Sequence, residues 1–334
     1  MSVAGWFASN ASVWKEEPST ETAAVLPTTR QRLAIALAIG VSAGAFAGLM
    51  TLRDGASPDF AYPHTAARFF LQGENPYHVM EGPPGSRAPF DQPLFYPFPT
   101  VLLVLPFAPF PVSIATGLFF GLSAAAMAYA ITRDGLWRIH AFASAPFVLA
   151  ASVGQFSPLL MLMAFYPRFG FLAAIKPNLG LALFLRRPSL HAIVGSVLLL
   201  MLSVALLPSW PADWLESLRR SVSDETHRAP VLQGGGFLLL LAAIAWRTGA
   251  GRLLLALSLL PQALLFYDQL LLWLIPRTRT QSMVLTSASQ LGMIVWYLTL
   301  DPARNGILAA YPFIVPSVFL PALGIVLWNH WRPQ

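Results

Sequence analysis

Apolar runs long enough to cross a lipid bilayer recur along this chain from Leu33 to the C-terminus. The first of them, residues 33–52, contains no charged residue. Hydrophobic residues make up 56% of the sequence and charged residues 11%, whereas about a quarter of a soluble domain is charged. A soluble fold would have to bury all these runs in one core. The sequence therefore predicts an all-α polytopic membrane protein.

Arginines at the ends of the apolar runs set the expected orientation. Arg30 and Arg32 precede the first run, which places the N-terminus in the cytoplasm. Residues 1–30 are then a flexible cytoplasmic tail, and residues 31–334 a single transmembrane domain of about ten to twelve segments. Two extracytoplasmic loops, 53–96 and 209–233, are expected to carry short interfacial helices. The first could be an ordered lid over a site or a plain connector.

The charge and the absence of cysteine exclude other classes of function. The net charge of +6 is explained by arginines at loop ends, so it does not require a nucleic-acid partner. A chain without cysteine cannot form disulfides or thiolate metal sites. His64 and His78 have no further histidine or acid at metal-binding spacing. The sequence thus predicts neither a metal site nor a cofactor.

The first outer loop contains a predicted helix with recognisable ends. Pro63 suits the first helical position, and Gly73 suits a left-handed stop. Arg68 is expected on the wetter side of this helix. Asp59 is then expected in the loop at its mouth, near the membrane surface, where it could act as a general base. The alternative is a capping or solvated loop carboxylate.

Three further polar residues lie within apolar segments. A lysine within a membrane span, such as Lys176, costs roughly 2.5–3.5 kcal/mol of insertion free energy. Its side chain is therefore expected either to bind a phosphate in a cavity or to extend to the membrane interface. Gln155 needs a hydrogen-bond partner, which a neighbouring helix could provide. Asp268, followed by Gln269, is either functional or part of an ion pair that holds helices together.

Taken in order, these residues resemble the motifs of membrane-embedded C-type glycosyltransferases. The most similar branch is glycosyltransferase family 87, whose members are polyprenyl-phosphate-mannose-dependent mannosyltransferases. The resemblance covers residues 32–275 and rests on Asp59, Tyr62, Ala66-Ala67, Leu71-x-Gly73-x-Asn75-Pro76-Tyr77, Tyr96-Pro97, Gly154-Gln155, Lys176-Pro177 and Pro261…Tyr267-Asp268. The chain departs from the family in its short segments around residues 154–176, and in Asp268 and Gln269 where relatives often have a histidine.

The resemblance implies a C-type bundle and an inverting transfer of a hexose, mannose in the nearest branch. The donor would be a polyprenyl-phosphate sugar and the acceptor a lipid or glycan, on the outer side of a bacterial inner membrane. Asp59 matches the family's general base, and Lys176, or secondly Arg68, would hold the donor phosphate. The remaining expected substrate contacts are Asp54, His64, Asn75, Tyr77, Gln155, Tyr267, Asp268 and Gln269. The alternatives are a transporter or flippase for an amphiphilic solute, and a non-catalytic scaffold.

Overall fold

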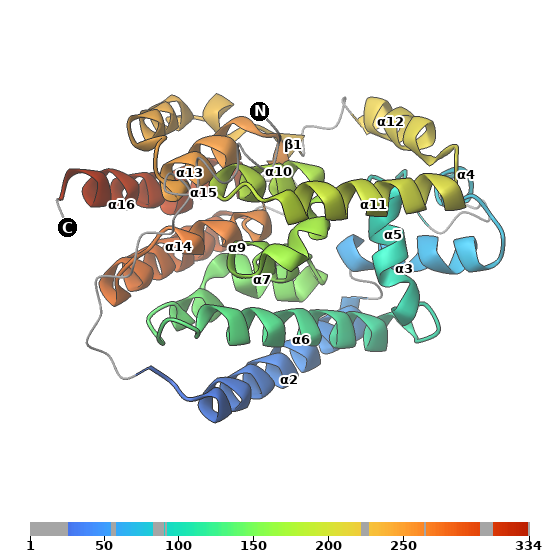
Figure 1. Ribbon diagram of the computed structural model, residues 1–334, viewed down its shortest axis with the longest axis horizontal. Coiled ribbons are helices and arrows are strands. Elements are labelled where there is room, and N and C mark those ends of the chain that lie inside the picture. The colour runs from blue at the N-terminus through green and yellow to red at the C-terminus, as the bar shows by residue number, and fades with distance from the viewer. Residues whose placement is uncertain are drawn as a thin grey trace.

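The computed structural model describes residues 26–54, 58–82, 90, 92–221, 227–263, 265–300 and 310–332, most of which are helical (Figure 1). Elements marked η are 3₁₀ helices, except the π-helix η8. The first half contains α2 (Thr29–Asp54), α3 (Pro58–Leu71), α4 (Pro76–Val79), α5 (Phe98–Val104), η1 (Leu105–Phe107), α6 (Val112–Ile131), η2 (Ile139–Ala143), α7 (Ala145–Val153), α8 (Ser157–Leu160) and α9 (Leu162–Phe165). The second half contains η3 (Pro167–Ala174), α10 (Pro177–Arg186), α11 (Leu190–Leu206), α12 (Trp210–Ser221), η4 (Pro230–Leu232), η5 (Gly236–Ala245), α13 (Gly249–Leu259), η6 (Tyr267–Leu274), α14 (Arg279–Thr299), α15 (Tyr311–Ile314), η8 (Val315–Phe319) and α16 (Leu320–Trp331).

The expected all-α class is confirmed. The sheet in the described part of the chain is one antiparallel pair, β1 (His227–Arg228) with β2 (Gln262–Ala263). Most of the expected tail, residues 1–25, and residues 83–89 of the first outer loop lie outside the described residues.

Several helices could cross a membrane. Within the described residues three are long and apolar enough: α2, α6 and the continuous run Tyr311–Trp331. Two bent pairs would raise the number to five, α7 with α8 and α9 at 119° and α11 with α12 at 98°. The expected ten to twelve segments are not confirmed. Proline and glycine break residues 141–186 into short helices, so many apolar runs do not form full-length spans.

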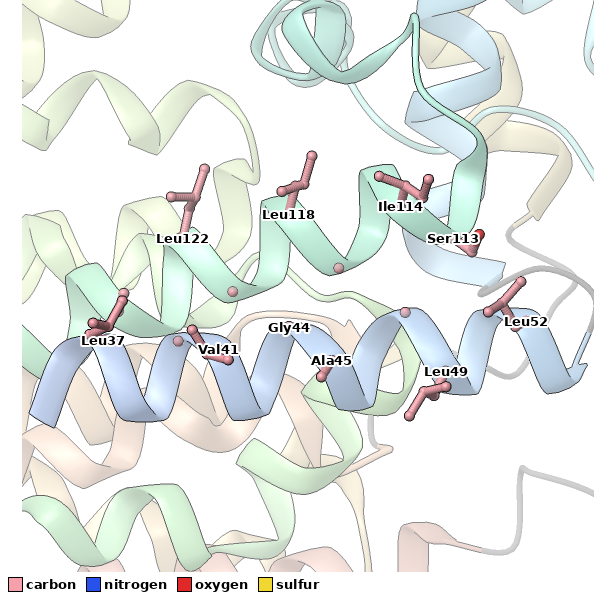
Figure 2. Close-up of a pocket in the computed structure, with 15 residues that line it drawn as sticks. Leu37, Val41, Gly44, Ala45, Leu49, Leu52, Ser113, Ile114, Leu118 and Leu122 are labelled. Carbon is pink, nitrogen blue, oxygen red and sulfur yellow. The ribbon is translucent and has the colours of Figure 1, made fainter.

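α2 and α6 pack together through glycines (Figure 2). A Cβ atom at Gly44 would lie 2.6 Å from the carbonyl oxygen of Gly117, and one at Gly117 would lie 2.9 Å from that of Gly44. Small residues four apart allow such backbone contact between membrane helices. Outside this contact lies an apolar groove of about 630 Å³, bordered by leucines such as Leu49 and Leu118. The two helices thus form one apolar wall of the molecule.

The helix of the first outer loop begins earlier than the sequence predicted. α3 starts at Pro58, so Asp59 lies in its first turn and Pro63 lies inside the helix. Either proline can occupy a first helical position, because neither has an N–H to satisfy. Pro63 removes one helical hydrogen bond, the one that the Asp59 carbonyl would accept. The predicted stop is confirmed, since Gly73 has a φ of +81°.

Residues 209–233, where the sequence predicted an interfacial helix, contain the helix α12. It follows α11 at a bend of 98° and lies beside α4 at one end of the molecule (Figure 1). Its two tryptophans pack against protein, because Trp210 is 4% exposed and the indole of Trp214 donates to the carbonyl of Phe95 at 2.9 Å. α12 is therefore fixed to the rest of the chain by its indole rings.

Candidate functional site

Four polar side chains from four separate parts of the chain meet within the helical body. Asp59 lies in the first turn of α3, Gln155 just after α7, Lys176 just before α10 and Asp268 in η6. The Lys176 Nζ atom donates to Asp268 Oδ1 at 2.6 Å and to Gln155 Oε1 at 3.1 Å. Gln155 also forms a side-chain hydrogen bond with Asp59. We call these four residues the polar cluster.

Gln155 is positioned by the glycine before it. Gly154 ends α7 in the left-handed region, with a φ of +68°. A Cβ atom there would lie 2.8 Å from both Phe60 Cβ and Thr116 Cγ2. Glycine satisfies both the backbone conformation and the close packing. The end of α7 therefore approaches α3 and α6 closely, which brings Gln155 towards Asp59.

Lys176 is positioned by the proline after it. Pro177 occupies the first position of α10 and disfavours a helical backbone at the preceding residue, so Lys176 has φ −142° and ψ 81°. The hydroxyl of Thr100 donates to the carbonyl of Ile175 at 2.5 Å and ties this backbone to α5. The lysine side chain, 15% exposed, therefore turns towards Asp268 instead of extending to the membrane interface.

Asp268 follows a strained backbone position. Phe266 has a φ of +69°, the single positive value among non-glycine residues in the described part of the chain. A bulky residue in that region costs about 1–3 kcal/mol, and such strain gathers at functional sites. Phe266 is fully buried, and its ring packs against Trp296. The helix η6 begins directly after this kink, at Tyr267. The centre of the Tyr267 ring lies 5.5 Å from Lys176 Nζ.

The carboxyl of Asp59 has a shifted pKa. Burial raises the pKa of its carboxyl from 3.8 to about 6. The positive charge of Lys176 lowers this pKa, the negative charge of Asp268 raises it, and hydrogen bonds from Gln155 and Tyr96 lower it. The carboxyl is ionised at neutral pH, yet it is more basic than an ordinary aspartate. That combination suits a general base.

Tyr96 donates to Asp59 from the loop before α5. Its hydroxyl lies 3.4 Å from Asp59 Oδ1, a long bond for two oxygen atoms. Burial raises the pKa of Tyr96 well above 10.0, so the phenol keeps its proton and remains a donor. Its backbone is held in turn, because the hydroxyl of Tyr77 donates to the Tyr96 carbonyl at 2.9 Å.

Three buried oxygen atoms, one in the polar cluster and two on residues within two positions of it in the sequence, lack hydrogen-bond partners among the described residues. Asp268 Oδ2, Gln269 Oε1 and Ser157 Oγ are fully enclosed, and no described residue hydrogen-bonds to them. Asp268 and Gln269 are both 0% exposed. Buried acceptors are rarely left unpaired in folded proteins. These atoms are therefore candidates to accept hydrogen bonds from hydroxyl groups when the site operates.

Two predicted site residues lie on α3 but turn away from the polar cluster. A ring nitrogen of His64 lies 3.2 Å from the carbonyl oxygen of Phe110, and its ring stands 5.9 Å from that of Phe60. Burial lowers the pKa of His64, so the ring is neutral at pH 7. Arg68 is exposed on the last turn, and among described residues the charges that act on Asp59 are those of Lys176 and Asp268.

The remaining predicted contacts support the cluster from outside it. Asn75 caps α4, and Tyr77 holds the backbone of Tyr96. The side-chain nitrogen of Gln269 donates to Gln262 Oε1 at 2.8 Å, which links η6 to β2. The side chain of Asp54, the last residue of α2, lies outside the described residues.

The two outer loops contact each other beside the site. Asp213 of α12 accepts from Asn75 Nδ2 at 2.8 Å and lies 3.2 Å from His78 Nε2. Arg220 forms an ion pair with Glu81. These contacts join α12 to α4 and to the backbone just after it. The sequence placed both loops on the same side of the membrane, and their contact agrees with that.

Tyr96 and Ser157 were not predicted as site residues. The Tyr96-Pro97 pair is one of the motifs of the family resemblance but was given no site role, and Ser157 has no sequence signal beyond its nearness to Gln155. A tyrosine just before Pro-Phe-Pro at a membrane boundary was the available signal. For a metal, no group of three histidine, aspartate or glutamate side chains gathers in the described residues.

Comparison of the chain with family models, with curated proteins and with solved structures finds no match.

Proposed function

We propose that this chain is an integral-membrane glycosyltransferase that moves a hexose, mannose by its resemblance, from a polyprenyl-phosphate donor to a hydroxyl acceptor on the outer side of the membrane. The observation that carries the proposal is the convergence of a basic carboxylate and an ammonium group. Asp59, with a pKa of about 6, and Lys176 are joined through Gln155, although they lie 117 positions apart in the sequence. An inverting sugar transfer to a hydroxyl requires these two groups.

The reaction assigns one role to each group. Asp59 takes the proton of the acceptor hydroxyl as its oxygen forms a bond to the anomeric carbon. The bond between that carbon and the phosphate oxygen breaks, and its electron pair stays on the prenyl phosphate. Lys176 lies where it can stabilise this growing negative charge. Attack from the face opposite the leaving phosphate inverts the anomeric configuration.

The elements around the cluster fit a lipid-linked donor. The apolar helices α2 and α6 could cross a membrane, and the outer loops contact each other beside Asp59 and Tyr96. A donor anchored in the bilayer would reach the cluster from the lipid side, whereas a polar acceptor would enter from water.

The test is transfer of radiolabelled mannose from polyprenyl-phosphate mannose into membrane glycolipids by the purified protein in lipid nanodiscs. Asp59→Asn should lower the initial rate by at least about a hundredfold, because general-base groups contribute about 10²–10⁴. Asp134→Asn is the matched control, since Asp134 is 47% exposed and pairs with Arg133 and Arg138. Full activity of Asp59→Asn would remove this residue from the mechanism.

A second candidate function is a proton-coupled carrier for a lipid-linked solute. The buried ion pair of Lys176 and Asp268 favours it, because charged pairs within membrane helices often line transport paths. Flux of labelled polyprenyl-phosphate mannose across proteoliposomes, without product formation, would support this alternative over the transferase.

A further inference from the structure

The polar cluster contains one ammonium group and two carboxyl groups in the described residues. The ammonium is that of Lys176, and the carboxyls are those of Asp59 and Asp268. With all three ionised, the cluster has a net charge of −1. Lys176 already has hydrogen-bond partners, because its Nζ atom donates to Asp268 Oδ1 and to Gln155 Oε1. Its charge is matched before any ligand arrives.

A lipid phosphodiester adds another negative charge to this cluster. If nothing else changed, the net charge would become −2 within a partly buried site, and like charges at such distances repel strongly. Lys176 could bind the phosphate only by weakening its contact with Asp268. That carboxylate is 0% exposed, and its Oδ2 atom accepts no hydrogen bond from the described residues. A buried carboxylate without a partner cation takes up a proton because the charged form is too costly.

We propose that a lipid phosphodiester binds at Lys176 together with one proton, which Asp268 accepts on Oδ2 as it releases the lysine. The proposal rests on the transferase function above and adds a positioning role for Asp268. The charges balance, since a phosphodiester of −1 and a proton of +1 leave the net charge at −1. Bound donor then faces a free ammonium group, a neutral Asp268 and an ionised Asp59.

The neighbouring groups favour Asp268 as the proton acceptor. Asp59 keeps its hydrogen bonds from Tyr96 and Gln155 when Lys176 moves. Among the described residues, the other titratable groups that face the cluster are the phenols of Tyr96 and Tyr267. Both phenols are already protonated at neutral pH. Among the described residues, Lys176 is the one side chain that donates a hydrogen bond to the Asp268 carboxylate, so Asp268 loses its donor when the lysine leaves.

The test is isothermal titration calorimetry of the full-length purified protein with a short-chain polyprenyl-phosphate mannose. Titrations at pH 7 in two buffers of different ionisation enthalpy give the number of protons taken up. We expect about one proton per bound donor, and a Kd that rises by up to about tenfold per pH unit above neutrality. An uncharged prenyl mannoside should bind without proton uptake. Donor binding without proton uptake would overturn this inference alone, whereas no donor binding would overturn it together with the proposed function.

Variants locate the proton. Asp268→Asn imitates the protonated form, so its proton uptake should fall to zero and its Kd should lose its dependence on pH. Asp268→Glu keeps a carboxyl group and should keep the uptake, and it remains informative if the asparagine variant fails to fold. Asp59→Asn should also keep the uptake. Uptake that disappears in Asp59→Asn and persists in Asp268→Asn would place the proton on Asp59 and overturn the proposal.

Discussion

Single side chains at the polar cluster have opposing effects on the basicity of Asp59. Burial raises its pKa to about 6, and the hydrogen bonds from Gln155 and Tyr96 hold that pKa down. Without these donors the carboxyl would be protonated more often at neutral pH and would be less available as a base. The tyrosine thus contributes, after Lys176 and Gln155, to lowering the acid end of the pH range in which the site works.

Tyr96→Phe tests this at the residue scale. Loss of the hydroxyl removes a bond to the ionised form, so the pKa of Asp59 should rise above about 6. The acid limb of the pH profile of kcat/KM should then shift to higher pH. The shift should be less than about one unit because the bond is long, 3.4 Å. Tyr297→Phe, at a side chain that is 72% exposed, is the control. A shift to lower pH would contradict the assignment of Asp59 as the base.

At the scale of elements, the cluster depends on where helices stop. α7 ends at Gly154 and α10 begins at Pro177, and each break places a polar side chain towards the same point. The kink at Phe266 does the same for η6. Short helices with strained or left-handed ends let polar groups converge where continuous spans would have separated them.

Gly154→Ala should therefore damage the site far more than an equivalent change elsewhere. A Cβ atom at this position collides with Phe60 and Thr116 at 2.8 Å, which would move the chain at Gln155. Gly73→Ala is a matched control, because Gly73 also has a positive φ but a Cβ atom there meets nothing within 4 Å. Both variants incur about 1–2 kcal/mol of backbone strain. Initial transfer rates should fall by at least about tenfold in Gly154→Ala and little in Gly73→Ala, and equal losses would mean that backbone strain alone matters.

At the scale of the whole molecule, the composition predicted the all-α class, and the positions of proline and glycine predicted some helix ends. Neither predicted the contacts between residues that are distant in the sequence. An unbroken apolar run follows Pro111 in the sequence, and α6 begins directly after this proline, at Val112. The start of α3 was wrong, because Pro58 and Pro63 suit a first turn equally well. Lys176 and Asp268 were each predicted to need a partner. Their pairing was not predictable, since it brings together residues that lie 92 positions apart and depends on how η6 packs.

The arginine rule also predicts that the helix ends at Arg186 and Arg252 lie in the cytoplasm, and the contacts at the helix ends are compatible with this. The guanidinium of Arg252 donates to the carbonyls of Leu185 at 2.8 Å and Arg186 at 3.1 Å, so two ends expected in the cytoplasm meet. The two loops expected outside also meet, through Asp213 and Asn75. This arrangement agrees with one orientation for the whole bundle and places the polar cluster near its outer loops.

Single cysteines test that orientation directly, because the natural chain has no cysteine to interfere. Gln72→Cys and Glu216→Cys change exposed side chains of the two outer loops, and Arg247→Cys changes an exposed side chain between η5 and α13. In intact spheroplasts a membrane-impermeant maleimide should label the first two, and should label the third only after the membrane is permeabilised. Arginines flanking the spans favour the cytoplasmic side, which is the physical reason for this expectation. Labelling of all three in intact spheroplasts, or the reverse pattern, would place the acceptor on the wrong side for the proposed reaction.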